Sequence, residues 1–130
     1  MIVAAKDLSG AALDWAVAKA EGLPLKKDPM GFGSGSEAGW WVWYGTPASE
    51  KVGSQISPSR NWEQGGVILE RENIAVELMT APGQLPKVWM SHSPSHLCFI
   101  SYGPTALIAA MRTHVAAKLG GDIDIPEDLT

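Results

Sequence analysis

The sequence predicts an α+β fold in which three helices pack on a small antiparallel sheet of three to five strands. Three observations lead to this prediction. Apolar residues recur at helical spacing in three segments of the chain. Short apolar or alternating segments, which are typical of strands, lie between these helices. Neighbouring strand segments are separated by about two to five residues, which favours antiparallel hairpins.

The first helix is expected to follow Ser9 and to run to about Glu21. Leu13 and Val17 recur at helical spacing, so one face of this helix is apolar. Ser9 is a residue type that caps helix starts, and its side chain could satisfy a free amide of the first turn. Gly22 is suited to end the helix.

The second helix is expected to begin at Asn61, and Gln64 three residues later resembles the partner residue of a capping box. Gly65 and Gly66 lower the helix propensity by about 1 kcal/mol each relative to alanine. A glycine pair at this place indicates close approach by another backbone or by a ligand. Asn73 can adopt the left-handed conformation that ends a helix.

The third helix has the clearest pattern. Thr105 is a good N-cap residue, and Gly120 follows the last apolar position. The apolar positions that step by four are Leu107, Met111, Val115 and Leu119. The strand candidates are Trp40–Tyr44, Ile74–Leu78, Val88–Ser91, Leu97–Tyr102 and a short edge strand at Ile123–Ile125.

No internal repeat or long linker divides the chain, so we expect a single domain over residues 1–130. Residues 26–36 and 46–59 are rich in small, polar and proline residues and are predicted to be mobile loops. Residues 122–130 are predicted to form an acidic C-terminal tail.

Ten Lys and Arg residues stand against fourteen Asp and Glu residues, which gives a net charge of −4. Four of the acids lie in the last nine residues, so the rest of the chain is neutral. No basic stripe is present, so we expect no nucleic-acid partner. The longest apolar run, Ala106–Met111, is far shorter than the roughly twenty residues of a membrane-spanning helix, and we expect no membrane partner.

His92, His96 and Cys98 could bind zinc, with His114 as a fourth ligand. Their spacing matches no standard zinc pattern, and Pro94 interrupts the strand register that would align them. No oxyanion-hole motif accompanies a pairing of Cys98 with a histidine. We therefore predict no metal site, no catalytic residue and no cofactor.

The glycine-rich run at residues 31–35 resembles a phosphate-binding loop only superficially. A Walker motif needs a lysine and a serine or threonine after its second glycine, and neither follows here. A dinucleotide fingerprint would lead into a helix, whereas a strand is predicted next. A flexible loop is the favoured interpretation.

Two helix starts together form a candidate binding site. Helix N-termini present free amides that attract anions. The candidate binding residues are Arg60, Asn61, Trp62 and Gln64 at the second helix and Gly103 and Thr105 at the third. If the two starts converge, they could bind a small anionic or aromatic ligand. The alternative is that these residues serve only as caps and packing contacts.

Six tryptophans are an unusual excess for a chain of this length. Trp40 and Trp41 are neighbours on a predicted strand, so their side chains point to opposite faces. One of the two then faces solvent, a covering loop or a partner. Because tryptophan is enriched at interface hot spots, Trp41 is a further candidate binding residue.

Three blocks of the sequence, at residues 7–22, 57–78 and 102–129, occur together in this order. The most specific are Ser-Arg-Asn-Trp-Glu-Gln-Gly-Gly at residues 59–66 and Gly-Pro-Thr at residues 103–105. The set resembles the NinX-like family of small bacteriophage and prophage proteins. Asn61 and Ala106 depart from the family's usual Asp and Pro, and both replacements are compatible with helix starts.

The resemblance implies a phage or prophage accessory protein of uncharacterised biochemistry that acts in the cytoplasm of the bacterial host cell. It implies no reaction and no catalytic residues. Our leading hypothesis is that the protein binds a host or phage protein. The alternative is a small-ligand or nucleotide-binding domain, possibly an enzyme, that uses the two helix starts. A third hypothesis is a homo-oligomer that uses the Trp40–Tyr44 strand as an edge.

Overall fold

The computed structural model describes residues 1–28, 39–44, 49–94 and 96–129 of the chain. Within these residues the chain forms three α-helices and eight short strands. The strands divide among three antiparallel sheets of two, three and three strands. The structure therefore confirms the α+β class, and it distributes the strands over three small sheets where the sequence predicts one.

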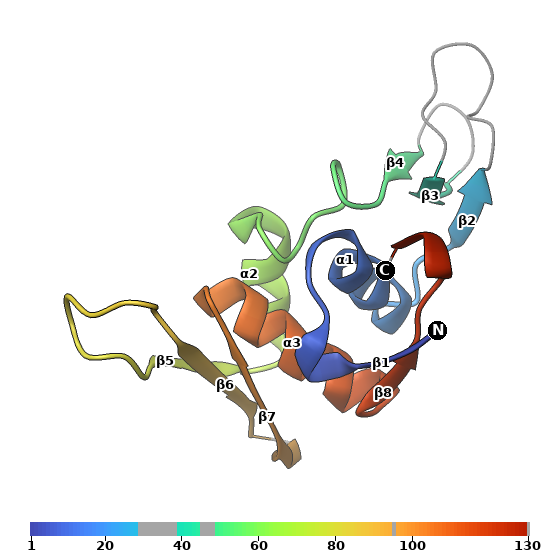
Figure 1. Ribbon diagram of the computed structural model, residues 1–130. Coiled ribbons are helices and arrows are strands. Elements are labelled where there is room, and N and C mark those ends of the chain that lie inside the picture. Colours follow the sequence, from blue (N-terminus) through green and yellow to red (C-terminus); the bar gives the residue numbers. More distant parts are fainter. Residues whose placement is uncertain (29–38, 45–48, 95, 130) are drawn as a thin grey trace.

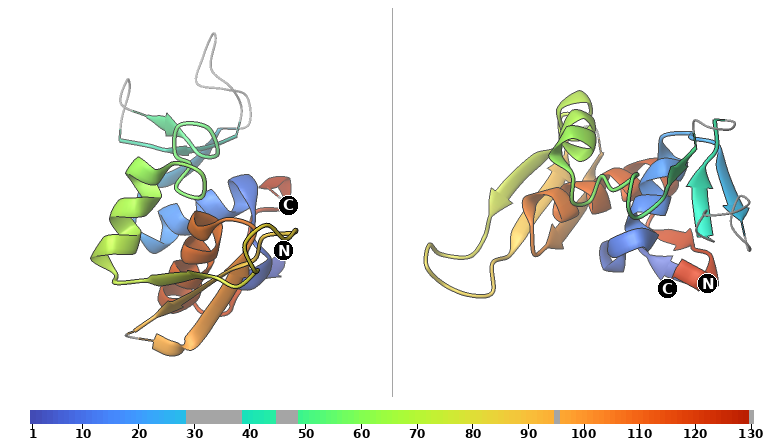
Figure 2. Two further views of the ribbon diagram at one scale, coloured as in Figure 1. Left: turned by 90° about the vertical axis from the view of Figure 1, so that its left-hand side faces the viewer. Right: turned by 90° about the horizontal axis from the view of Figure 1, so that it is seen from above.

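Helix α3 (Ala106–Leu119) lies at the centre of the molecule between two layers (Figures 1 and 2). On one side it packs against a sheet with strand order β5–β6–β7, and on the other it packs against α1 (Gly10–Ala20) and α2 (Trp62–Arg71). The strands of this sheet are Ala75–Leu78 (β5), Trp89–Ser93 (β6) and His96–Gly103 (β7).

A second three-stranded sheet lies beyond α1, at the opposite end of the molecule from β5–β6–β7 (Figure 2). Its strands are Leu25–Asp28 (β2), Gly39–Val42 (β3) and Glu50–Lys51 (β4). Val42 of β3 is fully buried, and Trp40 packs against the core. This sheet therefore extends the hydrophobic core beyond α1.

The third helix follows its prediction closely. The Thr105 side chain accepts a hydrogen bond from the Ile108 amide at 3.1 Å, as a helix N-cap should. Leu107, Met111 and Val115 are buried, and Leu119 is partly buried. The apolar stripe read from the sequence is thus the face that holds α3 in the core.

The second helix begins as predicted but with a different partner for Gln64. Asn61 caps α2 by accepting from the Glu63 amide at 2.9 Å. The Asn61 amide already donates to the Ser57 carbonyl, so Gln64 does not complete a capping box. Asn73 ends the segment at φ 54°, in the left-handed conformation expected for it.

The first helix begins after Ser9, as predicted, although the Ser9 side chain makes no capping hydrogen bond. No acidic residue lies in the first turn of α1 either. The positive end of the helix dipole therefore has no side-chain partner from its own first turn.

Several strands lie where the sequence predicts loops. β2 begins at Leu25 and runs into the predicted 26–36 loop, and β4 lies inside the predicted 46–59 loop. A further strand, Ile2–Ala4 (β1), is not predicted and pairs with Asp122–Asp124 (β8). The rest of the 26–36 loop, with its glycine-rich run, and residues 46–48 lie outside the described residues. The mobility of both loops stays a prediction.

The acidic C-terminal segment joins the fold through its apolar residues. Ile123 and Ile125 are buried, whereas the four acids are exposed. The strand predicted at Ile123–Ile125 is present as β8, shifted by one residue to Asp122–Asp124. The Ile125 amide donates to the Met1 carbonyl at 2.9 Å. The acidic segment is therefore anchored to the N-terminal strand.

Ion pairs tie the C-terminal ends of α1 and α2 to α3. Arg71 makes two hydrogen bonds to the Glu21 carboxylate, at 2.7 and 2.8 Å. Burial raises the pKa of Glu21, but Arg71 and His114 outweigh this effect and hold it below its usual range. Lys118 and Arg71 lower the pKa of Glu72 to about 2.

Candidate functional site

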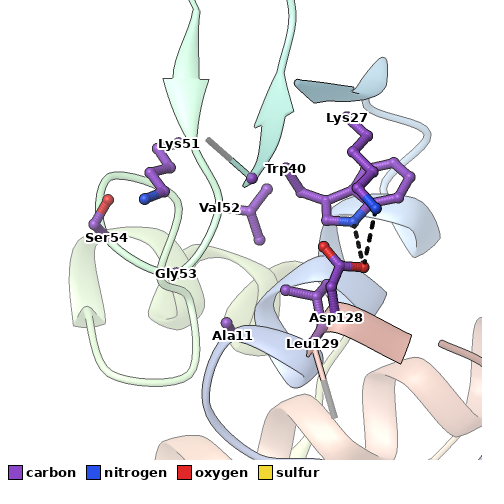
Figure 3. Close-up of a pocket in the computed structure, with 10 residues that line it drawn as sticks. Ala11, Lys27, Trp40, Lys51, Val52, Gly53, Ser54, Asp128 and Leu129 are labelled. Carbon is purple, nitrogen blue, oxygen red and sulfur yellow. Dashed lines mark hydrogen bonds and ion pairs between the residues drawn. The ribbon is translucent and has the colours of Figure 1, made fainter. Parts of the chain in front are cut away.

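A cavity of about 590 Å³ opens between α1, the β2–β3–β4 sheet and the 3-10 turn η2 (Glu127–Leu129) (Figure 3). This volume is in the range of small-molecule sites. The lining residues are Ala11, Lys27, Gly39, Trp40, Lys51, Val52, Gly53, Ser54, Asp128 and Leu129. They come from five segments of the chain that are far apart in the sequence.

Trp40 forms one wall of this cavity. Its ring meets Trp15 of α1 edge to face, with ring centroids 5.7 Å apart and planes at 76°. Its indole Nε1 donates to Asp128 Oδ1 at 3.4 Å, and Lys27 Nζ lies 3.7 Å from the same oxygen. Figure 3 shows this group on one side of the cavity and Lys51 and Ser54 on the other.

The first turn of α1 approaches the cavity closely. Gly53 has a φ of +94°, and a Cβ atom at this position would lie 3.0 Å from the Ala11 Cβ. Both the backbone conformation and the close contact require glycine here. The turn at residues 52–54 can therefore lie directly over the start of α1.

The predicted binding residues at the start of α2 bind their own chain. The Arg60 guanidinium donates to the Gly53 carbonyl. Gln64 Oε1 accepts from the Ser57 amide at 2.7 Å, and its Nε2 donates to the Gln55 carbonyl at 2.7 Å. Together with the bond from the Asn61 amide to the Ser57 carbonyl, these bonds hold residues 53–57 in place. Trp62 is 57 % exposed, and its ring lies beside Gly66.

The two helix starts do come together in the structure. A Cβ atom on Gly65 would lie 2.6 Å from Leu107 Cδ1, so the first turns of α2 and α3 are in contact. Thr105 caps α3. Gly103 is buried, and a Cβ atom at this position would collide with the Ala109 amide nitrogen. The structure thus gives these residues structural roles, and ligand binding by them stays a prediction.

Trp41, the remaining predicted binding residue, lies on β3. It pairs with Lys26 of β2 and Lys51 of β4, so β3 is the central strand of its sheet. Trp41 is half-buried and already interacts with another residue of the chain. Because β3 is paired on both sides, the Trp40–Tyr44 strand is not the free sheet edge that the homo-oligomer hypothesis expects.

The histidines lie on different elements. His92 lies on β6, and His114 is buried on α3 with Nε2 3.2 Å from Glu21 Oε2. Burial lowers the pKa of His114, against the opposing effect of Glu21. The side chains of His96 and Cys98 lie outside the described part of the structure. Among the described residues, no three metal-ligating side chains cluster.

A second surface feature is one face of the β5–β6–β7 sheet. Ser91 and Ser101 point toward α3 and are buried, and the Ser91 hydroxyl contacts the Thr113 hydroxyl at 2.6 Å. The alternate residues must therefore point away from α3. We call this surface the outer sheet face; its residues are Ala75, Glu77, Met90, His92, Ile100 and Tyr102.

The outer sheet face carries apolar side chains in contact with solvent. Strand pairing places Met90 beside Tyr102 and His92 beside Ile100. Ile100 and Tyr102 are 50 % and 51 % exposed. Figures 1 and 2 show α3 on one side of this sheet and none of the drawn helices on the other. Apolar patches of this kind mark interaction sites.

Sequence reasoning missed both features. Lys27, Lys51 and Asp128 meet only through tertiary contacts, and no local pattern connects them. The sequence contains only a weak signal for the outer sheet face. The predicted strand at Leu97–Tyr102 has apolar residues on both of its faces. Such a pattern cannot reveal which face a helix covers.

These features define a small α+β protein with a charged cavity and an uncovered apolar sheet face. A family model described as Bacteriophage P22, NinX matches residues 4–118, and the chain belongs to this family of bacteriophage proteins. The resemblance read from the three sequence blocks is thereby confirmed. A comparison with curated proteins found no match. No helix in the described residues is long and apolar enough to cross a membrane.

Proposed function

We propose that this phage accessory protein acts in the host cytoplasm by binding a host or phage protein through its outer sheet face. The observation that carries this proposal is the exposure of Ile100 and Tyr102 on a sheet whose opposite face is covered by α3. Exposed tyrosine and isoleucine side chains beside a methionine suit a protein partner, because apolar patches on a protein surface mark interaction sites.

Charge indicates the chemistry of the partner. The outer sheet face contains one carboxylate, Glu77, and neither lysine nor arginine among its residues. The chain as a whole carries a net charge of −4. The complementary partner surface is an apolar patch with basic groups around it. A second copy of this chain would oppose like charges, so a heterologous partner fits better.

The test begins with capture of proteins from lysate of the bacterial host, with and without phage infection. Each captured protein is then purified and titrated against the wild type and three variants by calorimetry. The paired change Ile100→Ser and Tyr102→Ser should weaken binding about ten-fold or more, because apolar anchors dominate interface energy. Val67→Ser, which alters a 60 % exposed residue on α2, is the matched control and should leave the affinity unchanged.

Trp41→Ala serves as the competing variant. If Trp41→Ala abolishes binding while the outer-face variant binds normally, the interface lies on β3 and the proposal is wrong. A stable dimer by light scattering that the outer-face variant dissociates would replace the heterologous partner with a second copy.

A further inference from the structure

We propose that a second cavity, beside α3, binds a small molecule that carries a phosphate monoester on an apolar body. This cavity opens between the 3-10 turn η1 (Ala5–Asp7), the loop that leads into β6, the end of β7 and α3. Its volume of about 470 Å³ is in the range of small-molecule sites. Three properties carry the inference: a guanidinium without a carboxylate partner, the charge of the lining and its apolar walls.

Arg112 of α3 lines the cavity and is held in a fixed position. Its Nε donates to the Leu8 carbonyl and its Nη1 to the Tyr102 carbonyl, each at 2.7 Å. Its Nη2 makes no hydrogen bond with a described residue, so donors of the planar fork remain available. A guanidinium of this kind can accept a phosphate group without first giving up its own partners.

The charge of Arg112 is poorly compensated within the protein. Burial lowers its pKa, and the charge of Asp7 opposes this effect. No carboxylate of the described residues lies within ion-pair distance of the guanidinium. Partly buried charges are normally paired, so an external anion would supply the partner that the chain itself does not.

The lining as a whole is basic, although the chain is acidic. Lys6 and Lys87 are exposed, and neither side chain makes an ion pair or a hydrogen bond with a described residue. With Arg112 and the single carboxylate Asp7, the described lining carries a net charge of +2. The whole chain carries −4. A phosphate monoester, which carries nearly two negative charges at neutral pH, is the complementary group.

The remaining walls suit an apolar body attached to the anion. Pro86, Val88 and Pro104 supply aliphatic surface, and Tyr102 is an aromatic residue that is 51 % exposed. A ring on the phosphate would gain contact with these residues, which inorganic phosphate cannot do. Tyr102 also belongs to the outer sheet face, but binding of a small molecule in this cavity requires no protein partner.

The test titrates the purified chain at pH 7 with 2-naphthyl phosphate. Binding is followed through the backbone amide signals of Lys87, Val88 and Gly103 in proton–nitrogen correlation spectra. These signals should shift saturably, with a Kd on the order of 1 mM or below. Neutral 2-naphthol and inorganic phosphate should each bind at least about five-fold more weakly, because each lacks one part of the ligand.

Variants separate this site from general surface binding. Lys87→Met should weaken binding of 2-naphthyl phosphate about three-fold, and Asp7→Asn should strengthen it by a similar factor. A gain of affinity in Asp7→Asn cannot arise from a misfolded protein. Lys26→Met is the matched control and should leave the affinity unchanged, because it removes an exposed lysine of β2, at the other end of the molecule (Figure 2).

Three results would each overturn the proposal. The first is the absence of saturable shifts at about ten times the expected Kd. The second is an affinity for 2-naphthol or for inorganic phosphate that equals the affinity for 2-naphthyl phosphate. The third is equal affinity of the wild type, Lys87→Met and Asp7→Asn for 2-naphthyl phosphate. Because the titration contains no protein partner, its failure would leave the proposed function of the outer sheet face unaffected.

Discussion

Asp14 of α1 is a buried carboxylic acid that contacts the segment leading into α2. It is 0 % exposed, and its Oδ1 accepts a hydrogen bond from the Ser59 amide at 3.0 Å. Its Oδ2 has no hydrogen-bond partner among the described residues. Burial raises the pKa of Asp14, and the bond from the Ser59 amide and the charge of Arg60 oppose this effect only in part.

The raised pKa predicts a destabilising effect at neutral pH. A group whose pKa is higher in the folded than in the unfolded state contributes stability at a pH below its unfolded pKa, which is near 3.8 here. This stability is lost as the pH rises through the folded pKa. Asp14→Asn keeps the oxygen that accepts from Ser59 and removes the charge. We expect it to increase the free energy of unfolding at pH 7, because the folded state then buries no charge at this position.

Urea denaturation from pH 4 to pH 8 measures this effect. The advantage of Asp14→Asn over the wild type should shrink as the pH falls toward 4. Asp122→Asn, which changes an exposed aspartate of β8, is the control and should show little difference at any pH. An Asp14→Asn variant that is less stable than the wild type at pH 7 would contradict the expectation.

At the scale of elements, the contact between α2 and α3 depends on one glycine. A Cβ on Gly65 would lie 2.2 Å from the Pro58 carbonyl oxygen and 2.6 Å from Leu107 Cδ1. A backbone oxygen cannot move away as a flexible side chain can. The close approach that the glycine pair indicates in the sequence is therefore made by the chain itself at Gly65.

Gly65→Ala should destabilise the protein although alanine is the better helix former. We expect a loss of about 1–3 kcal/mol, which is typical of overpacking. Gly66→Ala is the matched control, because its Cβ would meet only the Trp62 ring, at 3.3 Å, and that ring is largely exposed. The control should be neutral or gain up to about 1 kcal/mol from helix propensity. Thermal and denaturant unfolding measure both variants. Equal effects of Gly65→Ala and Gly66→Ala on the free energy of unfolding would refute this distinction.

At the scale of the whole molecule, the two ends of the chain close the fold. β1 and β8 pair along three residues, and the Met1 ammonium group lies 3.0 Å from Asp124 Oδ1. Ile123 and Ile125 belong to the same core as α1 and α3. The acidic segment is held by its isoleucines, because its charged side chains are exposed and contribute little.

Ile125→Ala should therefore lower the free energy of unfolding by about 2–5 kcal/mol, as expected for a buried isoleucine. Asp124→Ala, one residue away, breaks only an exposed ion pair and should cost at most about 1 kcal/mol. Denaturant unfolding of both variants measures the difference. Similar small losses in both would show that the C-terminal segment contributes little to the core.

Sequence alone predicts the three helices, the N-caps of α2 and α3 and the fold class. The capping contacts expected of Ser9 and Gln64 do not form. Thr105, Asn61 and Asn73 act locally, through their own side chains or backbone preference, so their roles are readable from neighbouring residues. The buried stripe of α3 is likewise encoded by spacing along one helix. The family also followed from ordered blocks of residues, which are a property of the sequence alone.

The number of sheets and the positions of the cavity and of the outer sheet face depend on tertiary contacts. Strands of two to four residues, such as β1, β2 and β4, carry too little pattern to stand out and form because distant segments pair with them. Gln64 and Arg60 bind residues 53–57 because the chain folds back beside them. The cavity joins Lys27, Lys51 and Asp128 across a hundred residues, and the outer sheet face exists because α3 covers only the other side. Contacts between remote residues depend on packing, and local periodicity does not encode them.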